Sequence, residues 1–203
     1  MKRFIQVIAI FTLFAHCHGA ASRGANCMKT SPALAVPLES TQQGLVVRWD
    51  THPGCIPVTY DPALGLYAAD LNAGLARWTG IAGSSLCFGA ASPSAQPPAL
   101  GSRAIYMSAA KDPNQATDLT TVITFDIQTG LVRSGDVFVR QPPQKTVSPA
   151  HFLREVGHLI PVGNAAAGVD SIMHGSVAPS DVVTATDEAS VLALYGRSPL
   201  CVE

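Results

Sequence analysis

The segment between Ser148 and Pro161 constrains this chain most, because its residues mark both ends of one helix. Ser148 is a favourable N-cap, and Pro149 suits the first helical position, where no backbone hydrogen bond is lost. Pro161 ends the helix, since it lacks the N–H that would continue it and disfavours helical geometry in the preceding residue. One face is apolar and consists of Phe152, Val156, Leu159 and Ile160. The sequence therefore predicts an amphipathic helix over residues 148–160.

A carboxylate and two imidazoles lie on a second face of this helix. His151, Glu155 and His158 are spaced i, i+4, i+7, so Glu155 and His158 stand one turn apart. Such a pair suits metal-dependent hydrolysis, in which imidazole holds zinc and a carboxylate takes a proton from zinc-bound water. His151 lies about 10 Å along the axis from His158 and is not expected to reach the same ion. Glu155 and His158 are therefore the first candidate site residues.

Further elements are predicted from the periodicity of apolar residues. Strands are expected over residues 45–49, 56–60, 85–88, 103–107, 120–126 and 132–140, the last two joined as a hairpin. Helices are expected over residues 67–78 and 187–195, the second capped by Thr184 or Thr186 and ended by Gly196. The mixture predicts an α+β fold in one domain over residues 44–203, preceded by a loose polar arm over residues 21–43.

The first twenty residues are expected to be a secretory signal peptide. Lys2 and Arg3 precede an apolar run over residues 4–15, and small residues follow at Gly19 and Ala20. The run is too short to cross a hydrocarbon core of ~30 Å. We therefore expect an exported protein, secreted or periplasmic, with no membrane attachment after cleavage.

The cysteines and the charge limit the partners. An even number of cysteines in an exported chain predicts two disulfides, with the pairing left open. The cysteines beyond the signal segment are Cys27, Cys55, Cys87 and Cys201. The formal net charge is −1 and no basic cluster occurs, which argues against binding to nucleic acid or an anionic membrane. We expect a monomer.

Five segments in order suggest a family. They are a strand–helix–strand block over residues 56–88, paired strands over 120–140, REVGHLIPVGN at 154–164, SIMHG at 171–175 and TDEASVLALYG at 186–196. Together they resemble the matrixin-type metzincins, which are zinc-dependent endopeptidases, over residues 45–196. The resemblance implies a zincin-like single domain with a mixed twisted sheet, an active-site helix and a C-terminal helix. It also implies a turn at Met173 that forms the floor beneath the metal.

The zinc motif of that family, His-Glu-x-x-His-x-x-Gly-x-x-His, is only partly kept. The resemblance makes Glu155 the general base and His158 the second zinc ligand, while Arg154 and Asn164 replace the first and third ligands. Arginine has no lone pair to donate and repels a cation, and a neutral amide oxygen is a poor zinc ligand. Pro161 replaces the glycine, and since it holds φ at about −65°, we expect the loop from 161 to 163 to take a different path.

Two arrangements of the site remain open. A rebuilt metal site would combine Glu155 and His158 with His174 or Asp170, which follow and precede Met173. Otherwise zinc is absent or weakly bound, and His158 is a hydrogen-bonded histidine on a half-buried helix.

Arg154 also has two possible orientations. Its guanidinium either fills the position of the metal, where it neutralises Glu155 and bonds to Asp170 or Asn164, or it points into solvent.

The sequence predicts an exported matrixin-like protein that has lost ordinary zinc peptidase chemistry. Such a pseudoprotease would bind a peptide or protein ligand in its cleft, along an edge strand. The alternative is an active zinc metalloendopeptidase with a non-standard ligand set, in which Glu155 is the base. A third hypothesis is a degenerate product without specific activity.

Overall fold

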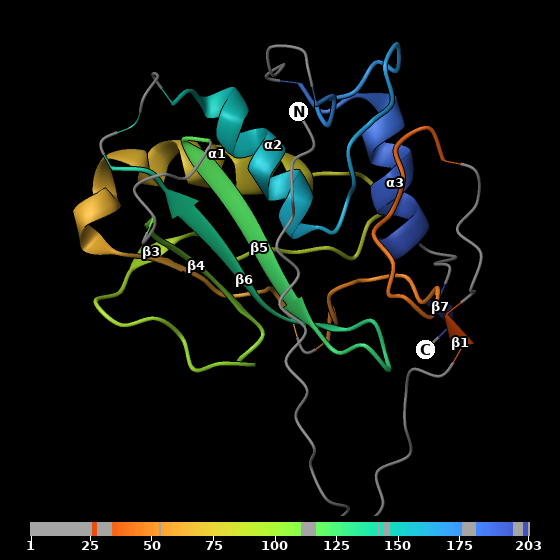
Figure 1. Cartoon of the computed structure of the whole chain (residues 1–203), viewed down its shortest axis with the longest axis horizontal. Helices are drawn as coiled ribbons and strands as arrows, with labels where there is room; N and C mark the ends of the chain where they lie inside the picture. Colours follow the sequence, from red (N-terminus) through yellow and green to blue (C-terminus); the bar gives the residue numbers. More distant parts are fainter. Residues whose placement is uncertain are drawn as a thin grey trace, which may run out of the picture.

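The structure is a computed structural model that describes residues 26–27, 34–52, 54–110, 117–141, 143, 147–175, 182–196 and 201–202 (Figure 1). The expected signal segment, residues 1–20, lies outside the described residues. Two helices, α1 and α2, lie side by side over one face of a sheet, and a third helix, α3, stands at one side (Figure 1). Among the described residues, no helix is long and apolar enough to cross a bilayer. The expected α+β class with a mixed sheet is confirmed.

The main sheet has five strands in the order β3-β2-β4-β6-β5. Their bounds are β2 Val58–Tyr60, β3 Ser92–Pro93, β4 Ala104–Ala109, β5 Leu119–Phe125 and β6 Val132–Val139. Strands β3, β2, β4 and β6 run parallel, and β5 pairs antiparallel with β6 at one edge. The hairpin between β5 and β6 turns at Gly130, whose φ of 72° favours glycine. The antiparallel strand therefore forms the outer edge of the sheet.

The helices occur where the sequence places them. They are the 3-10 helix η1 Pro62–Tyr67 followed by α1 Ala68–Thr79, then α2 Pro149–Leu159 and α3 Ala185–Tyr195. At the start of α2 the Ser148 N–H donates to Nδ1 of His151 at 3.2 Å, so this histidine caps the helix. At the start of α3 the Thr184 hydroxyl accepts from the N–H of Asp187, which selects Thr184 as the cap.

Two of the expected strands are wrong. Residues 45–49 and 85–88 join no ladder and make only single bridges, Ser40 with Val46, Arg48 with Leu131 and Ile56 with Phe88. Their apolar side chains are nevertheless buried, so apolar patterning found the burial but not the pairing. The short strand β3, in a segment rich in proline and serine, was missed because its residues favour turns.

Helix α2 is fixed by close packing on both sides. The indole N–H of Trp49 donates to the Leu159 carbonyl at 2.6 Å, and that of Trp78 donates to the Leu153 carbonyl at 2.7 Å. Both indoles are fully buried. Gly157 packs directly against the Met173 sulfur, and an added Cβ there would lie 2.9 Å from the Trp78 ring. The packing around α2 therefore leaves no room for even one added methyl group at Gly157.

The segment over residues 34–43 corrects the expected domain boundary. Val36 is fully buried and Leu38 is 9% exposed. The Glu39 N–H donates to the Pro161 carbonyl at 2.9 Å, and the Gly163 N–H donates to the Pro37 carbonyl at 2.8 Å. This segment thus pairs with the loop that follows α2 and belongs to the domain, so the loose arm does not extend to residue 43.

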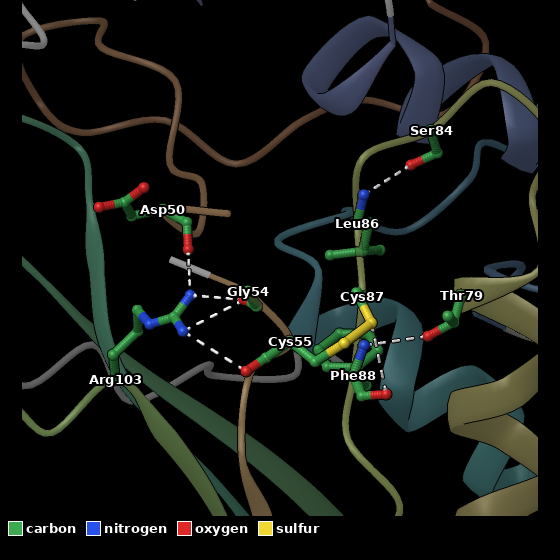
Figure 2. Close-up of a disulfide and its surroundings, with 9 residues drawn as sticks. All are labelled: Asp50, Gly54, Cys55, Thr79, Ser84, Leu86, Cys87, Phe88 and Arg103. Carbon is green, nitrogen blue, oxygen red and sulfur yellow. Dashed lines mark hydrogen bonds between the residues drawn. A yellow bond between two sulfur atoms is a disulfide. The ribbon is translucent and has the colours of Figure 1, made fainter. Parts of the chain in front are cut away.

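A disulfide joins Cys55 to Cys87 (Figure 2). Beside it the Arg103 guanidinium donates to the carbonyls of Asp50 at 2.6 Å and Gly54 at 3.1 Å, which holds the loop before β2 (Figure 2). The backbones of β1 (Asn26–Cys27) and β7 (Cys201–Val202) pair antiparallel, with Cys27 opposite Cys201. One bridge of the expected two is therefore assigned, and the existence of a second stays a prediction.

The contact at Gly157 makes a test of the α2 packing. We expect Gly157→Ala to lower the free energy of unfolding by about 1–2 kcal/mol. Overpacking costs about 1–3 kcal/mol, which exceeds the gain of about 1 kcal/mol in helix propensity. Gly65→Ala is the control, because a Cβ at Gly65 meets nothing within 4 Å. Urea unfolding measures both variants, and equal stability of the two would contradict the packing described above.

Candidate functional site

Arg154 points inward from α2 and is only 9% exposed. Its Nη2 donates to Oδ1 of Asn164 at 2.7 Å, across the loop that follows the helix. Its Nη1 lies 3.9 Å from Oε1 of Glu155, a looser ion pair. Of the two orientations open from the sequence, the structure therefore has the guanidinium turned away from solvent. Of the two acceptors considered from the sequence, the one that accepts from Arg154 is Asn164.

Glu155 is held from the sheet as well as from its own helix. The Thr121 hydroxyl, on the edge strand β5, lies 2.9 Å from Oε2 of Glu155 and 3.2 Å from its backbone carbonyl. The carboxylate thus has a hydroxyl donor on one oxygen and the Arg154 cation near the other. Its position therefore depends on both β5 and α2.

His158 has one ring nitrogen committed to the backbone. Nδ1 lies 3.1 Å from the carbonyl of Val162. Because a carbonyl can only accept, Nδ1 carries the proton of this hydrogen bond. Histidines that bind metals are commonly oriented by such a bond, but so are histidines with no ligand role. His158 is half-buried.

The turn at Met173 lies beside the Asn164 loop. The Ala165 N–H donates to the Met173 carbonyl at 3.0 Å, and Ala165 pairs with His174 in a parallel bridge. Met173 is fully buried and its sulfur packs against Gly157 of α2. The residues of α2, the loop and the turn therefore converge on one region.

The side chains that converge there do not fit a zinc ion. In the part of the chain that the structure describes, no three His, Cys, Asp or Glu side chains come together in a way that could hold a metal. Glu155 and His158 are thus not joined by His174 or Asp170 into a ligand set, and a guanidinium lies beside them. A tetrahedral catalytic site requires three protein ligands and an open position. We therefore derive no step that uses a metal.

Two residues that hold this region together, Asp187 and Thr121, were not predicted from the sequence as site residues. Asp187 is fully buried and accepts from the N–H of Ile172 at 3.1 Å, from the N–H of Thr184 at 2.9 Å and from the Ser171 hydroxyl. It thereby fastens the turn before Met173 to the start of α3. Thr-x-x-Asp at 184–187 is a capping-box pattern that could have revealed it. No sequence signal singles out Thr121 from the other threonines of β5.

Pro161 does not behave as we expected. Its φ is 36°, so the chain leaves α2 through the left-handed region that proline was expected to prevent. The pyrrolidine ring holds φ near −65°, so a positive φ at this position is strained for proline and is one that glycine adopts without penalty. The contacts of the loop with residues 37–39 and with Gly157 hold it in place.

Comparisons with protein-family models and with curated proteins found no match for this chain.

The strain at Pro161 predicts a stabilising substitution. We expect Pro161→Gly to raise the free energy of unfolding by about 1 kcal/mol, because glycine adopts a positive φ without a steric penalty. Pro149→Gly is the control: Pro149 lies in the first turn of α2, where proline is favoured, so its loss is expected to destabilise. Thermal unfolding compares the two, and a lower midpoint for Pro161→Gly would show that the strain is not there.

Proposed function

We propose that the chain is an exported, matrixin-like metzincin homologue that has lost zinc peptidase chemistry and binds extended peptide segments. The observation that carries this proposal is the 2.7 Å hydrogen bond between Arg154 and Asn164. The resemblance aligns these two positions with zinc ligands, and residues that once surrounded one ion should lie within reach of each other. A cation at a position aligned with a zinc ligand would repel a metal ion.

The order of the elements supports the proposal. Strand β2, helix α1, strand β4, the paired strands β5 and β6, helix α2, the Met173 turn and helix α3 follow one another in the order that the resemblance implies, although β4 begins at Ala104 and not at residue 85. The burial of Met173 against α2 agrees with a floor beneath the site. The retained Glu155 has a partner in Thr121 that fixes it without a metal.

The proposed binding surface is the outer edge of β5. Among the described residues, β6 is its only neighbour in the sheet, so the opposite edge has backbone groups able to pair with another strand. An extended peptide added there would run past Thr121, whose hydroxyl contacts Glu155. Recognition by β-augmentation uses backbone hydrogen bonds for affinity and side-chain pockets for specificity. This surface therefore suits a peptide or an extended protein segment.

Export follows from the same proposal. A disulfide such as Cys55–Cys87 persists in an oxidising compartment, which fits the expected signal segment. We propose that the mature protein is secreted or periplasmic and acts as a monomer.

The zinc content separates this proposal from its alternative. After dialysis against trace zinc, we expect elemental analysis to find no stoichiometric zinc in the wild type. The variant Arg154→His, Asn164→His, Pro161→Gly should bind about one zinc per chain, because it regains three imidazoles around one centre. The control is the variant Arg154→Ala, Asn164→Ala, Pro161→Gly, which gains no ligand.

Each other result has a definite meaning. One tightly held zinc in the wild type would favour an active metalloendopeptidase with a non-standard ligand set. A triple histidine variant that folds and binds no zinc would overturn the metzincin placement of the site.

The binding mode has its own test. Peptides selected from a displayed random library against the wild-type protein should lose at least about tenfold in affinity when alternate backbone nitrogens are methylated. That loss corresponds to one or two backbone hydrogen bonds. The control is the same peptide with the methyl groups moved by one residue, since successive N–H groups of a strand point to opposite sides. Equal affinity of the two methylated forms would contradict strand addition.

A further inference from the structure

We infer that a chain of polar side-chain contacts, called the polar relay here, holds β5, α2 and the loop after α2 in one arrangement. Its members are Thr121, Glu155, Arg154 and Asn164. The relay runs from β5 through two consecutive residues of α2 to the loop after that helix. This inference stands on contacts within the structure and does not depend on the resemblance or on peptide binding.

The burial of Arg154 is the first step. Arg154 is only 9% exposed, so its guanidinium has lost most of its hydration. The desolvation free energy is unfavourable unless anions and hydrogen-bond acceptors replace the lost water. Asn164 supplies an acceptor at 2.7 Å, and Glu155 supplies a negative charge at 3.9 Å. A long arginine side chain at this position could reach solvent, so its inward orientation indicates that these contacts outweigh the cost.

The second step is that Glu155 serves two elements at once. Its side chain is 14% exposed, and its two oxygens face different partners, Arg154 on the helix and Thr121 on β5. Thr121 also contacts the backbone carbonyl of Glu155 at 3.2 Å. A shift of β5 relative to α2 would therefore break the Thr121 contacts and leave the carboxylate with the arginine alone.

The third step is the far end of the relay. Asn164 directly precedes Ala165, which is tied to the Met173 carbonyl and pairs with His174. The Asn164 side-chain oxygen lies 3.8 Å from where a Cβ on Gly175 would be. The relay therefore ends against the Met173 turn, and the charge of Arg154 links the sheet edge to that turn.

A double-mutant cycle tests the relay. The variants are Arg154→Met, which keeps an unbranched apolar stem but removes the charge, Asn164→Ala, Thr121→Val and their pairs. We expect Arg154→Met to lower the unfolding midpoint by several degrees, and Asn164→Ala to add little once Arg154 is gone. Thr121→Val should also couple to Arg154→Met, through Glu155. Arg154→Lys should restore part of the loss, because it keeps the charge but not the forked donors.

Arg133→Met is the matched control. Arg133 pairs with Asp126 at 3.0 Å, but its side chain is 49% exposed, so its loss should change the midpoint little. It should also be additive with Asn164→Ala. Hydrogen exchange gives a second measurement: Arg154→Met should speed amide exchange several-fold in residues 119–125 and 161–175, and Arg133→Met should not.

The outcomes distinguish this inference from the proposed function. Additive effects of Arg154→Met and Asn164→Ala with unchanged exchange would overturn the relay. An Arg154→Met variant more stable than the wild type, with unchanged exchange, would overturn it too. If Arg154→Met and Asn164→Ala are coupled but the protein shows no strand-like peptide binding, the relay is supported and the proposed function is contradicted.

Discussion

The position of helix α2 is the constraint on which the rest of the structure depends. Two buried indoles, from Trp49 and Trp78, donate to the carbonyls of Leu159 at its C-terminal end and Leu153 near its middle, and Gly157 lets the Met173 sulfur reach its backbone. Neither contact tolerates a change of helix axis, because hydrogen bonds from buried donors are lost at full cost. The side chains of the candidate site project from this helix, so the packing beneath it sets their directions.

The opposite wall of the site is held by a different kind of interaction. The buried carboxylate of Asp187 accepts hydrogen bonds from the Met173 turn and from the start of α3. It thereby joins two segments that would otherwise meet only through apolar contact. A carboxylate near a helix N-terminus is also favoured by the helix dipole. The site is therefore held by apolar packing on one side and by a satisfied anion on the other.

The sequence predicted local structure better than long-range contacts. Ser148 and Pro149 marked the start of α2, and Thr184 was one of two candidates for the cap of α3, because capping acts over three residues. The hairpin was predicted because its two strands are adjacent in the sequence.

The orientation of Arg154 could not be predicted, since it depends on Asn164 across a loop and on burial by residues distant in the sequence. The burial of Val36 and Leu38 was missed for the same reason: their partners lie more than a hundred residues away. At Pro161 the tertiary contacts of the loop outweighed a strong local preference.

The paired N-terminal segment has a consequence for the order in which the chain folds. The Ser190 hydroxyl donates to the Val36 carbonyl across a separation of 154 residues, and the Trp49 N–H donates to the Tyr195 hydroxyl oxygen across 146. Contacts this distant carry a large loop-closure entropy and slow the search for the native state. Because α3 is synthesised long after residues 34–49, those residues remain without these partners until α3 has emerged. The domain can therefore close only after α3 has been synthesised.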